Sequence, residues 1–73
     1  GTIVRFIKSV RAYARGEALD GDPEPVGMVH PDQLGLYQNQ CYDSFGNQWN
    51  MIHFEAWDVL ALEEDFHATT LGA

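Results

Sequence analysis

Three histidines and one cysteine are the side chains in this sequence with the widest range of possible chemistry. His30, Cys41, His53 and His67 are all potential metal ligands, and they are separated along the chain by 11, 12 and 14 positions. Zinc sites in small domains usually take paired ligands from one short loop, because close spacing lowers the entropic cost of binding. No such pair is present here. We therefore expect no metal site and no cofactor.

A cysteine and a histidine can also act as nucleophile and base. His53 lies two positions from Glu55, which places both side chains on one face if a strand extends that far. A lone cysteine within a strand, such as Cys41, is more often a small buried residue, and a surface ion pair accounts for His53 and Glu55 equally well. We expect no catalytic residues and keep a small oligomeric enzyme or metal-dependent domain, using His53, Glu55 and Cys41, as an alternative.

Aromatic side chains suggest a different role, the binding of a partner. The densest stretch is YDSFGNQWNMIHF, residues 42–54, in which Trp49 and His53 fall on the same face of a strand. Exposed aromatic surfaces can bind proline-rich segments, although a core of this size also needs aromatic residues. The predicted binding residues are Tyr37, Tyr42, Trp49, His53 and Trp57, with Tyr13 as a further aromatic candidate.

Charge is divided unevenly along the chain. The four basic residues lie in positions 1–15 and the eleven acidic residues all follow, so that +4 and −11 give the net charge of −7. A body this acidic repels phosphate groups, which disfavours nucleic-acid binding. Acidic loops beside an aromatic surface would instead select a basic protein partner. Opposite charges on two parts of one chain also favour attraction between copies, so we expect a homo-oligomer.

The length of 73 residues allows one small domain, residues 1–73, and the hydrophobic content of 45% is enough for one core. A single cysteine excludes an intramolecular disulfide, which favours a reducing, cytoplasmic setting. No apolar run approaches the roughly 20 residues that cross a bilayer, so we expect no membrane partner.

The clearest local structure is a hairpin. Residues 36–42 and 48–54 have strand-like alternation, and DSFGN, residues 43–47, has the side chains of a tight turn. The prolines, glycine and acidic residues of segment 20–25 predict a loop. After a break at residues 55–56, a further strand is expected to about residue 62. We expect residues 67–73 to be a frayed tail.

The N-terminal segment, residues 2–15, fits two structures. A helical period collects its apolar residues on one side, whereas the β-branched and aromatic residues of TIVRFI favour a strand. GTIVRFI followed by RGE resembles the opening strand of small SH3-like barrels, and FEAWDVLALEEDF is similar to the acidic turn and closing strand of such barrels. The resemblance implies a mainly β fold, a small SH3-like barrel of about five antiparallel strands. The alternative is an α+β fold with an amphipathic N-terminal helix packed on a hairpin sheet.

These observations favour a non-catalytic protein–protein interaction module or accessory subunit that binds through an aromatic face rimmed by acidic loops. Besides the enzyme or metal-dependent alternative, a short acidic chain without a motif is also consistent with a protein of a phage or mobile element.

Overall fold

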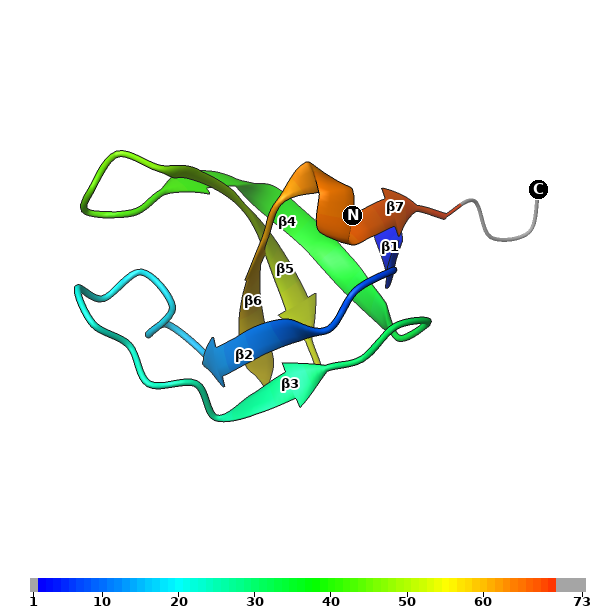
Figure 1. Ribbon diagram of the computed structural model, residues 1–73, viewed down its shortest axis with the longest axis horizontal. Helices are drawn as coiled ribbons and strands as arrows, with labels where there is room; N and C mark the ends of the chain where they lie inside the picture. The colour runs from blue at the N-terminus through cyan, green and yellow to red at the C-terminus, as the bar shows by residue number, and fades with distance from the viewer. Residues whose placement is uncertain (1, 70–73) are drawn as a thin grey trace.

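The fold is a single curled antiparallel sheet, seen in a computed structural model that describes residues 2–69. Its 7 strands follow the order β3-β2-β6-β5-β4-β1-β7 and curl into a half-barrel (Figure 1). The elements are β1 (Ile3–Phe6), β2 (Val10–Ala14), β3 (Gly27–Val29), β4 (Leu34–Tyr42), β5 (Gln48–Phe54), β6 (Trp57–Ala61), the short 3₁₀ helix η1 (Glu63–Asp65) and β7 (Phe66–Ala68). The predicted mainly β, small barrel-like fold is confirmed.

Two bent segments explain why there are more strands than the five expected. β1 pairs with β4, and β2 pairs with β3. β1 and β2 therefore form one long segment that is interrupted at residues 7–9, and β3 and β4 form another that is interrupted at residues 30–33. In the second break Pro31 lacks an N–H for the ladder, and Asp32 has a positive φ of 72°. The bend lets β2 leave β4 and pair with β6.

The alternative of an N-terminal helix is wrong. Val4 and Phe6 are buried in alternation with exposed Arg5, as in a strand. Ile7, which a helix would place on its apolar side, lies in the break between β1 and β2 and is exposed. β1 is hydrogen-bonded to a strand on each side, β4 and β7. This pairing outweighs the helical period of the apolar residues, because tertiary contacts decide the structure of short segments.

The predicted hairpin is present, and a second hairpin takes the place of the expected break at residues 55–56. β4 and β5 pair in register around residues 43–47, with a bulge between Tyr37 and Asn39. β5 and β6 are joined by only two residues, as Phe54 pairs with Trp57. Glu55 takes a φ of 55° in this turn. The central strands are thus held by two short hairpins, and their side chains alternate between the two faces of the sheet.

The core fills the concave face of the curl. Its buried members are Val4, Phe6, Ala12, Val29, Ile52, Phe54, Val59 and Ala61. Two glycines allow close packing here: Gly27 lies against the ring of Trp57, and Gly35 lies against Ile52 and Phe6. A side chain at either glycine would displace these neighbours.

The C-terminal part of the described chain closes the sheet on β1. β7 includes His67 and Ala68, the first residues of the segment expected to be a frayed tail, and the Thr69 N–H donates to the Ile3 carbonyl at 2.9 Å. Residues 70–73 of that predicted tail lie outside the described residues. Within residues 2–69 no helix has the length and apolar character needed to cross a membrane.

We predict that Gly35→Ala destabilises the protein by about 1–3 kcal/mol, the range typical of overpacked cores. The new Cβ would lie 2.6 Å from Ile52 Cγ2 and 3.1 Å from the His53 carbonyl oxygen. Urea denaturation measures the change. Gly21→Ala is the matched control, since a Cβ there meets nothing within 4 Å. Equal stability of the two variants would contradict this account of the core.

Candidate functional site

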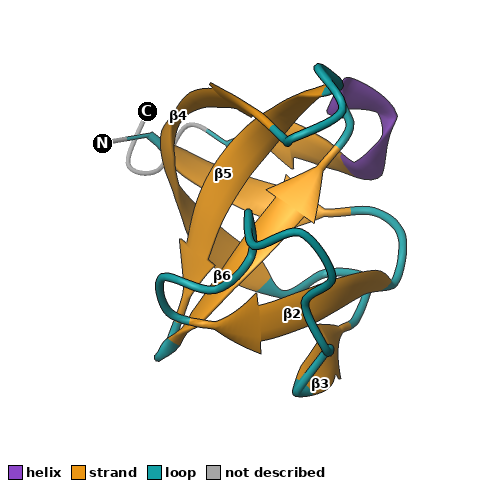
Figure 2. Cartoon of the chain, turned by 90° about the vertical axis from the view of Figure 1, so that its left-hand side faces the viewer, coloured by secondary structure: helices purple, strands orange, loops and turns teal. Residues whose placement is uncertain are grey.

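The outer, convex face of the sheet carries the side chains that alternate away from the core. As predicted, Trp49 and His53 point to one face of β5 and Ile52 and Phe54 to the other, where they are buried. The loop between β2 and β3 folds back over this outer face (Figure 2). Ala18, in that loop, is buried. The outer face is therefore partly covered, and it is shaped by the loop.

Two hollows meet on this face, and together we call them the outer groove. The first has a volume of about 150 Å³ and lies between the β2–β3 loop and the β4–β5 turn. The second, of about 300 Å³, extends toward η1. Both are lined by Tyr13, Trp49 and Leu60. Trp49 thus lies where the two hollows join, and its indole contributes to both walls.

Acidic side chains line the first hollow beside aromatic rings. Asp20 comes from the β2–β3 loop and Asp43 from the β4–β5 turn, and Phe45 at the tip of this turn is 82% exposed. The second hollow contains one charge of each sign, from Arg11 and Asp65. The negative potential of the groove is consequently concentrated at its loop end.

Asp43 fixes the indole of Trp49. Its Oδ2 accepts a hydrogen bond from Trp49 Nε1 at 3.0 Å and another from Asn47 Nδ2 at 3.1 Å. Its Oδ1 accepts the backbone N–H groups of Phe45 and Asn47, each at 2.9 Å. These hydrogen bonds, that of Trp49 above all, lower the pKa of Asp43 to about 2. Because the indole N–H is occupied, the Trp49 ring can offer a partner mainly its apolar surface.

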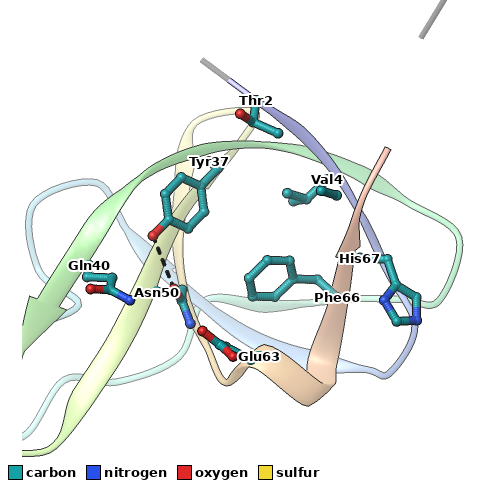
Figure 3. Close-up of a pocket in the computed structure, with 9 residues that line it drawn as sticks. Thr2, Val4, Tyr37, Gln40, Asn50, Glu63, Phe66 and His67 are labelled. Carbon is teal, nitrogen blue, oxygen red and sulfur yellow. Dashed lines mark hydrogen bonds between the residues drawn. The ribbon is translucent and has the colours of Figure 1, made fainter. Parts of the chain in front are cut away.

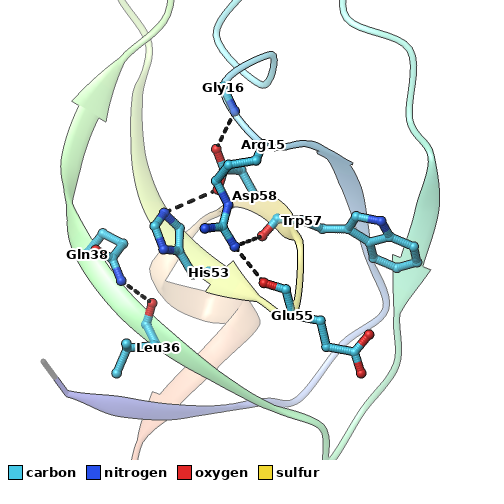
Figure 4. Close-up of polar contacts among 8 residues, drawn as sticks. All are labelled: Arg15, Gly16, Leu36, Gln38, His53, Glu55, Trp57 and Asp58. Atoms are coloured by element: carbon cyan, nitrogen blue, oxygen red, sulfur yellow. Dashed lines mark hydrogen bonds and ion pairs between the residues drawn. The ribbon is translucent and has the colours of Figure 1, made fainter.

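A buried carboxylate anchors the start of the β2–β3 loop. Asp58 is 4% exposed, and its Oδ2 accepts the Gly16 N–H at 3.0 Å (Figure 4). Its Oδ1 lies 2.7 Å from Arg15 Nε and 3.2 Å from His53 Nε2. Neither contact is aligned as a hydrogen bond to this oxygen. The negative charge is thus stabilised at Oδ2 by an amide and at Oδ1 by the charge of Arg15.

Arg15 also ties the loop to the β5–β6 turn. Its Nη2 donates to the Glu55 carbonyl at 2.6 Å and to the Trp57 carbonyl at 3.3 Å. The beginning of the loop, the β5–β6 turn and the start of β6 are therefore joined by one side chain.

The five residues predicted as one binding surface are not brought together. Trp49 and His53 share the outer face. Tyr37 and Trp57 pack against the core instead, with ring centroids 6.3 Å from Phe66 and 6.2 Å from Phe54, respectively. Tyr42 is exposed at the end of β4, outside the lining of both hollows.

Tyr13, the further aromatic candidate, does line the groove, whereas Phe45, Leu60 and Asp20 were missed. These three residues come from three separate segments: Phe45 from the β4–β5 turn, Leu60 from β6, which pairs with β5, and Asp20 from the β2–β3 loop. The acidic composition of the loop is the one signal in the sequence that could have pointed to Asp20.

The residues of the enzyme alternative are also separated. The carboxylate partner of His53 is Asp58, not Glu55, whose backbone lies in the β5–β6 turn. Cys41 lies opposite Trp49 on the neighbouring strand. Because Trp49 and His53 are four residues apart on β5, at about 3.3 Å per residue, Cys41 lies roughly 13 Å or more from His53. Burial and the charge of Asp43 raise the pKa of the Cys41 thiol, so the thiolate is disfavoured. Residues 2–69 contain no group of three or more His, Cys, Asp or Glu side chains that could hold a metal ion.

Comparison of the chain with protein-family models, with curated proteins and with solved structures gives no match. Function is therefore inferred from the residues of the outer groove, from their charges and from the contacts that hold them.

The lowered pKa of Asp43 predicts a loss of stability in acid. The folded value of about 2 is below the ordinary 3.8, so the ionised carboxylate stabilises the folded state above about pH 3.8. This contribution is lost as the pH falls through about 2. Urea denaturation followed by tryptophan fluorescence should show a decline across this window, and Asp43→Asn should lower stability at pH 7 and flatten the decline.

Asp20→Asn is the control for this prediction, because it removes the same charge and the Asp20 side chain makes no hydrogen bond or ion pair with the described residues. If Asp43→Asn and Asp20→Asn had the same stability at pH 7 and the same acid profile, Asp43 would not hold the turn.

Proposed function

We propose that this protein is a non-catalytic interaction module, or an accessory subunit, that binds a basic, extended segment of a partner protein in the outer groove. The observation that carries the proposal is the position of Trp49, which is fixed at the junction of two hollows with acidic side chains at one end.

The apolar part of the groove supports binding to a protein segment. Tryptophan and tyrosine are the residues that most often dominate binding energy at protein interfaces, and they do so when they lie in partly preformed pockets. Trp49 and Tyr13 are both half-buried, so each still has surface to lose on binding. Because Asp43 already holds the indole, little side-chain entropy remains to be lost. Elongated aromatic grooves of this kind suit an extended or polyproline segment.

The charges support a basic partner. Asp20 and Asp43 border the loop end of the groove, and the chain as a whole carries a net charge of −7. Such a field accelerates the approach of a cationic partner and suppresses binding of anionic ones. Arg11 and Asp65 at the other end provide a charge of each sign, which would give the bound segment a direction.

Self-association belongs to the same proposal, through a different part of the outer face. Leu34 and Leu36 on β4 are 48% and 41% exposed, and with Ile3 and His53 they line an apolar hollow of about 320 Å³. A small domain gains stability by covering such a surface. The proposed setting is the reducing cytoplasm, where the single thiol of Cys41 would remain unpaired.

The role of Trp49 can be tested with short peptides that are selected from a random display library for binding to the intact protein. The selected peptides should be rich in Lys and Arg. Trp49→Ala should weaken the binding of one such peptide by about thirtyfold, the loss typical of an interface hot spot, and Tyr42→Ala should leave it within about twofold. Isothermal titration calorimetry measures the affinity, and circular dichroism checks the fold. Equal affinity of the Trp49→Ala variant and the parent, or no enrichment of basic residues, would contradict the proposal.

The self-association prediction concerns Leu36. Sedimentation velocity should show an oligomer for the parent protein and a monomer for Leu36→Ser. Leu19→Ser is the control, because Leu19 is similarly exposed but lies in the β2–β3 loop. A parent protein that is monomeric at all concentrations would rule out this part of the proposal.

A further inference from the structure

Another pocket lies at the open end of the curled sheet, where β1, β4, β5, η1 and β7 meet (Figure 3). Its volume is about 400 Å³, which is within the range of small-molecule sites. Val4, Tyr37 and Phe66 form its apolar walls, and Gln40, Asn50 and Glu63 contribute its polar groups. None of these residues lines the outer groove. We call it the end pocket.

Asn50 is a polar residue at a position of β5 that faces the core. Ile52 and Phe54, which point to the same face of β5, are apolar. Asn50 is polar and nevertheless only 7% exposed. Its Oδ1 accepts a hydrogen bond from Tyr37 Oη at 3.2 Å, and its Nδ2 donates to the Ala61 carbonyl at 3.2 Å. One lone pair of Oδ1 and the lone pairs of Tyr37 Oη remain available. Two hydrogen-bond acceptors are thus held rigidly at the wall of the pocket.

Glu63 adds a negative charge to these acceptors. The turn that carries it is fixed at both ends, because Asp65 Oδ2 accepts the Leu62 N–H at 2.9 Å and the Asp65 carbonyl accepts the Ile7 N–H at 2.9 Å. Glu64, the next residue, pairs with Lys8 at 3.7 Å, whereas Glu63 has no ion-pair partner among residues 2–69. Glu63 lines the end pocket together with Asn50 and Phe66, and Figure 3 shows the His67 ring directed away from the Glu63 carboxylate.

We propose that the end pocket binds a small organic cation, an ammonium group on a compact apolar or aromatic body. The ammonium would donate hydrogen bonds to Glu63, Asn50 Oδ1 and Tyr37 Oη, and charge-assisted bonds of this kind are the strong ones. The rings of Tyr37 and Phe66, 6.3 Å apart and tilted by 37°, provide faces for the apolar body and for cation–π attraction. An anionic ligand would be repelled by Glu63.

This inference is independent of the proposed function, because the two sites share no lining residue and lie on different faces of the sheet. A free amine is favoured over the lysine side chain of a partner because the pocket offers a large apolar volume in addition to its hydrogen-bond acceptors. The linear stem of a lysine would leave the volume between Val4 and Phe66 unfilled.

The test is a ¹H–¹⁵N NMR titration of the intact chain at pH 7 with 2-phenylethylammonium, its neutral analogue 2-phenylethanol and N-acetyl-lysine amide. The ammonium should cause saturable shifts at Tyr37, Asn50 and Phe66, including the Asn50 side-chain amide. The alcohol should bind at least about tenfold more weakly, since bonds to charged groups are worth more than neutral ones.

Glu63→Gln should raise the dissociation constant of 2-phenylethylammonium by about tenfold or more. Glu64→Gln is the matched control, because it makes the same change of net charge one residue away, and it should change the constant by less than about twofold. Tyr37→Phe retains the aromatic ring and removes one hydrogen-bond acceptor. Weaker binding of 2-phenylethylammonium by this variant would be a second check that does not involve the net charge.

Three results would overturn the inference. The first is the absence of saturable shifts at the end pocket. The second is equal weakening of 2-phenylethylammonium binding by Glu63→Gln and Glu64→Gln, which would indicate general attraction to an acidic protein. The third is tighter binding of N-acetyl-lysine amide than of 2-phenylethylammonium, which would assign the ammonium to a protein side chain.

Discussion

The buried carboxylate of Asp58 is the interaction on which the outer face depends. A charge with so little exposure must be compensated, because removal from water costs more than attraction to a single partner returns. Here the compensation comes from the Gly16 amide and from Arg15, both at the start of the β2–β3 loop. The same Arg15 binds two carbonyls around the β5–β6 turn. The loop is therefore directed over β2 and β6, and the outer groove exists because the loop is held there.

The alternation of the strands divides chemistry between two faces of one sheet. On β5, odd-numbered residues supply Trp49 and His53 to the outer face, while even-numbered residues supply the core and, at the open end, Asn50. The two tryptophans illustrate the division. Trp49 is held by a carboxylate at the groove, and Trp57 covers Gly27 and Phe54 at the edge of the core. One sheet thus carries the outer groove on one face and the end pocket on the other.

Local patterns were sufficient to predict the hairpin of β4 and β5, the break at residues 55–56 and the face shared by Trp49 and His53, because turn chemistry and strand alternation act over a few residues. They did not distinguish a helix from a strand in residues 2–15, because the strand conformation there depends on the pairing of β1 with β4 and β7.

Local patterns also could not predict which residues come together in each site. His53 has its carboxylate partner across the sheet at Asp58, not two residues along at Glu55, and Tyr37 faces the end pocket, because strand order and register set these contacts.

The outer groove requires a β2–β3 loop that Asp58 holds in order on the outer face, and backbone ¹⁵N relaxation measures this order directly. We predict order parameters of about 0.85 for residues 16–18, the value of rigid backbone, and a marked fall in the Asp58→Asn variant while the order parameters of β5 and β6 stay unchanged. Values below about 0.6 in the parent protein would contradict it. The outer groove would then not be preformed, and the role of Asp58 as the anchor of the loop would be refuted.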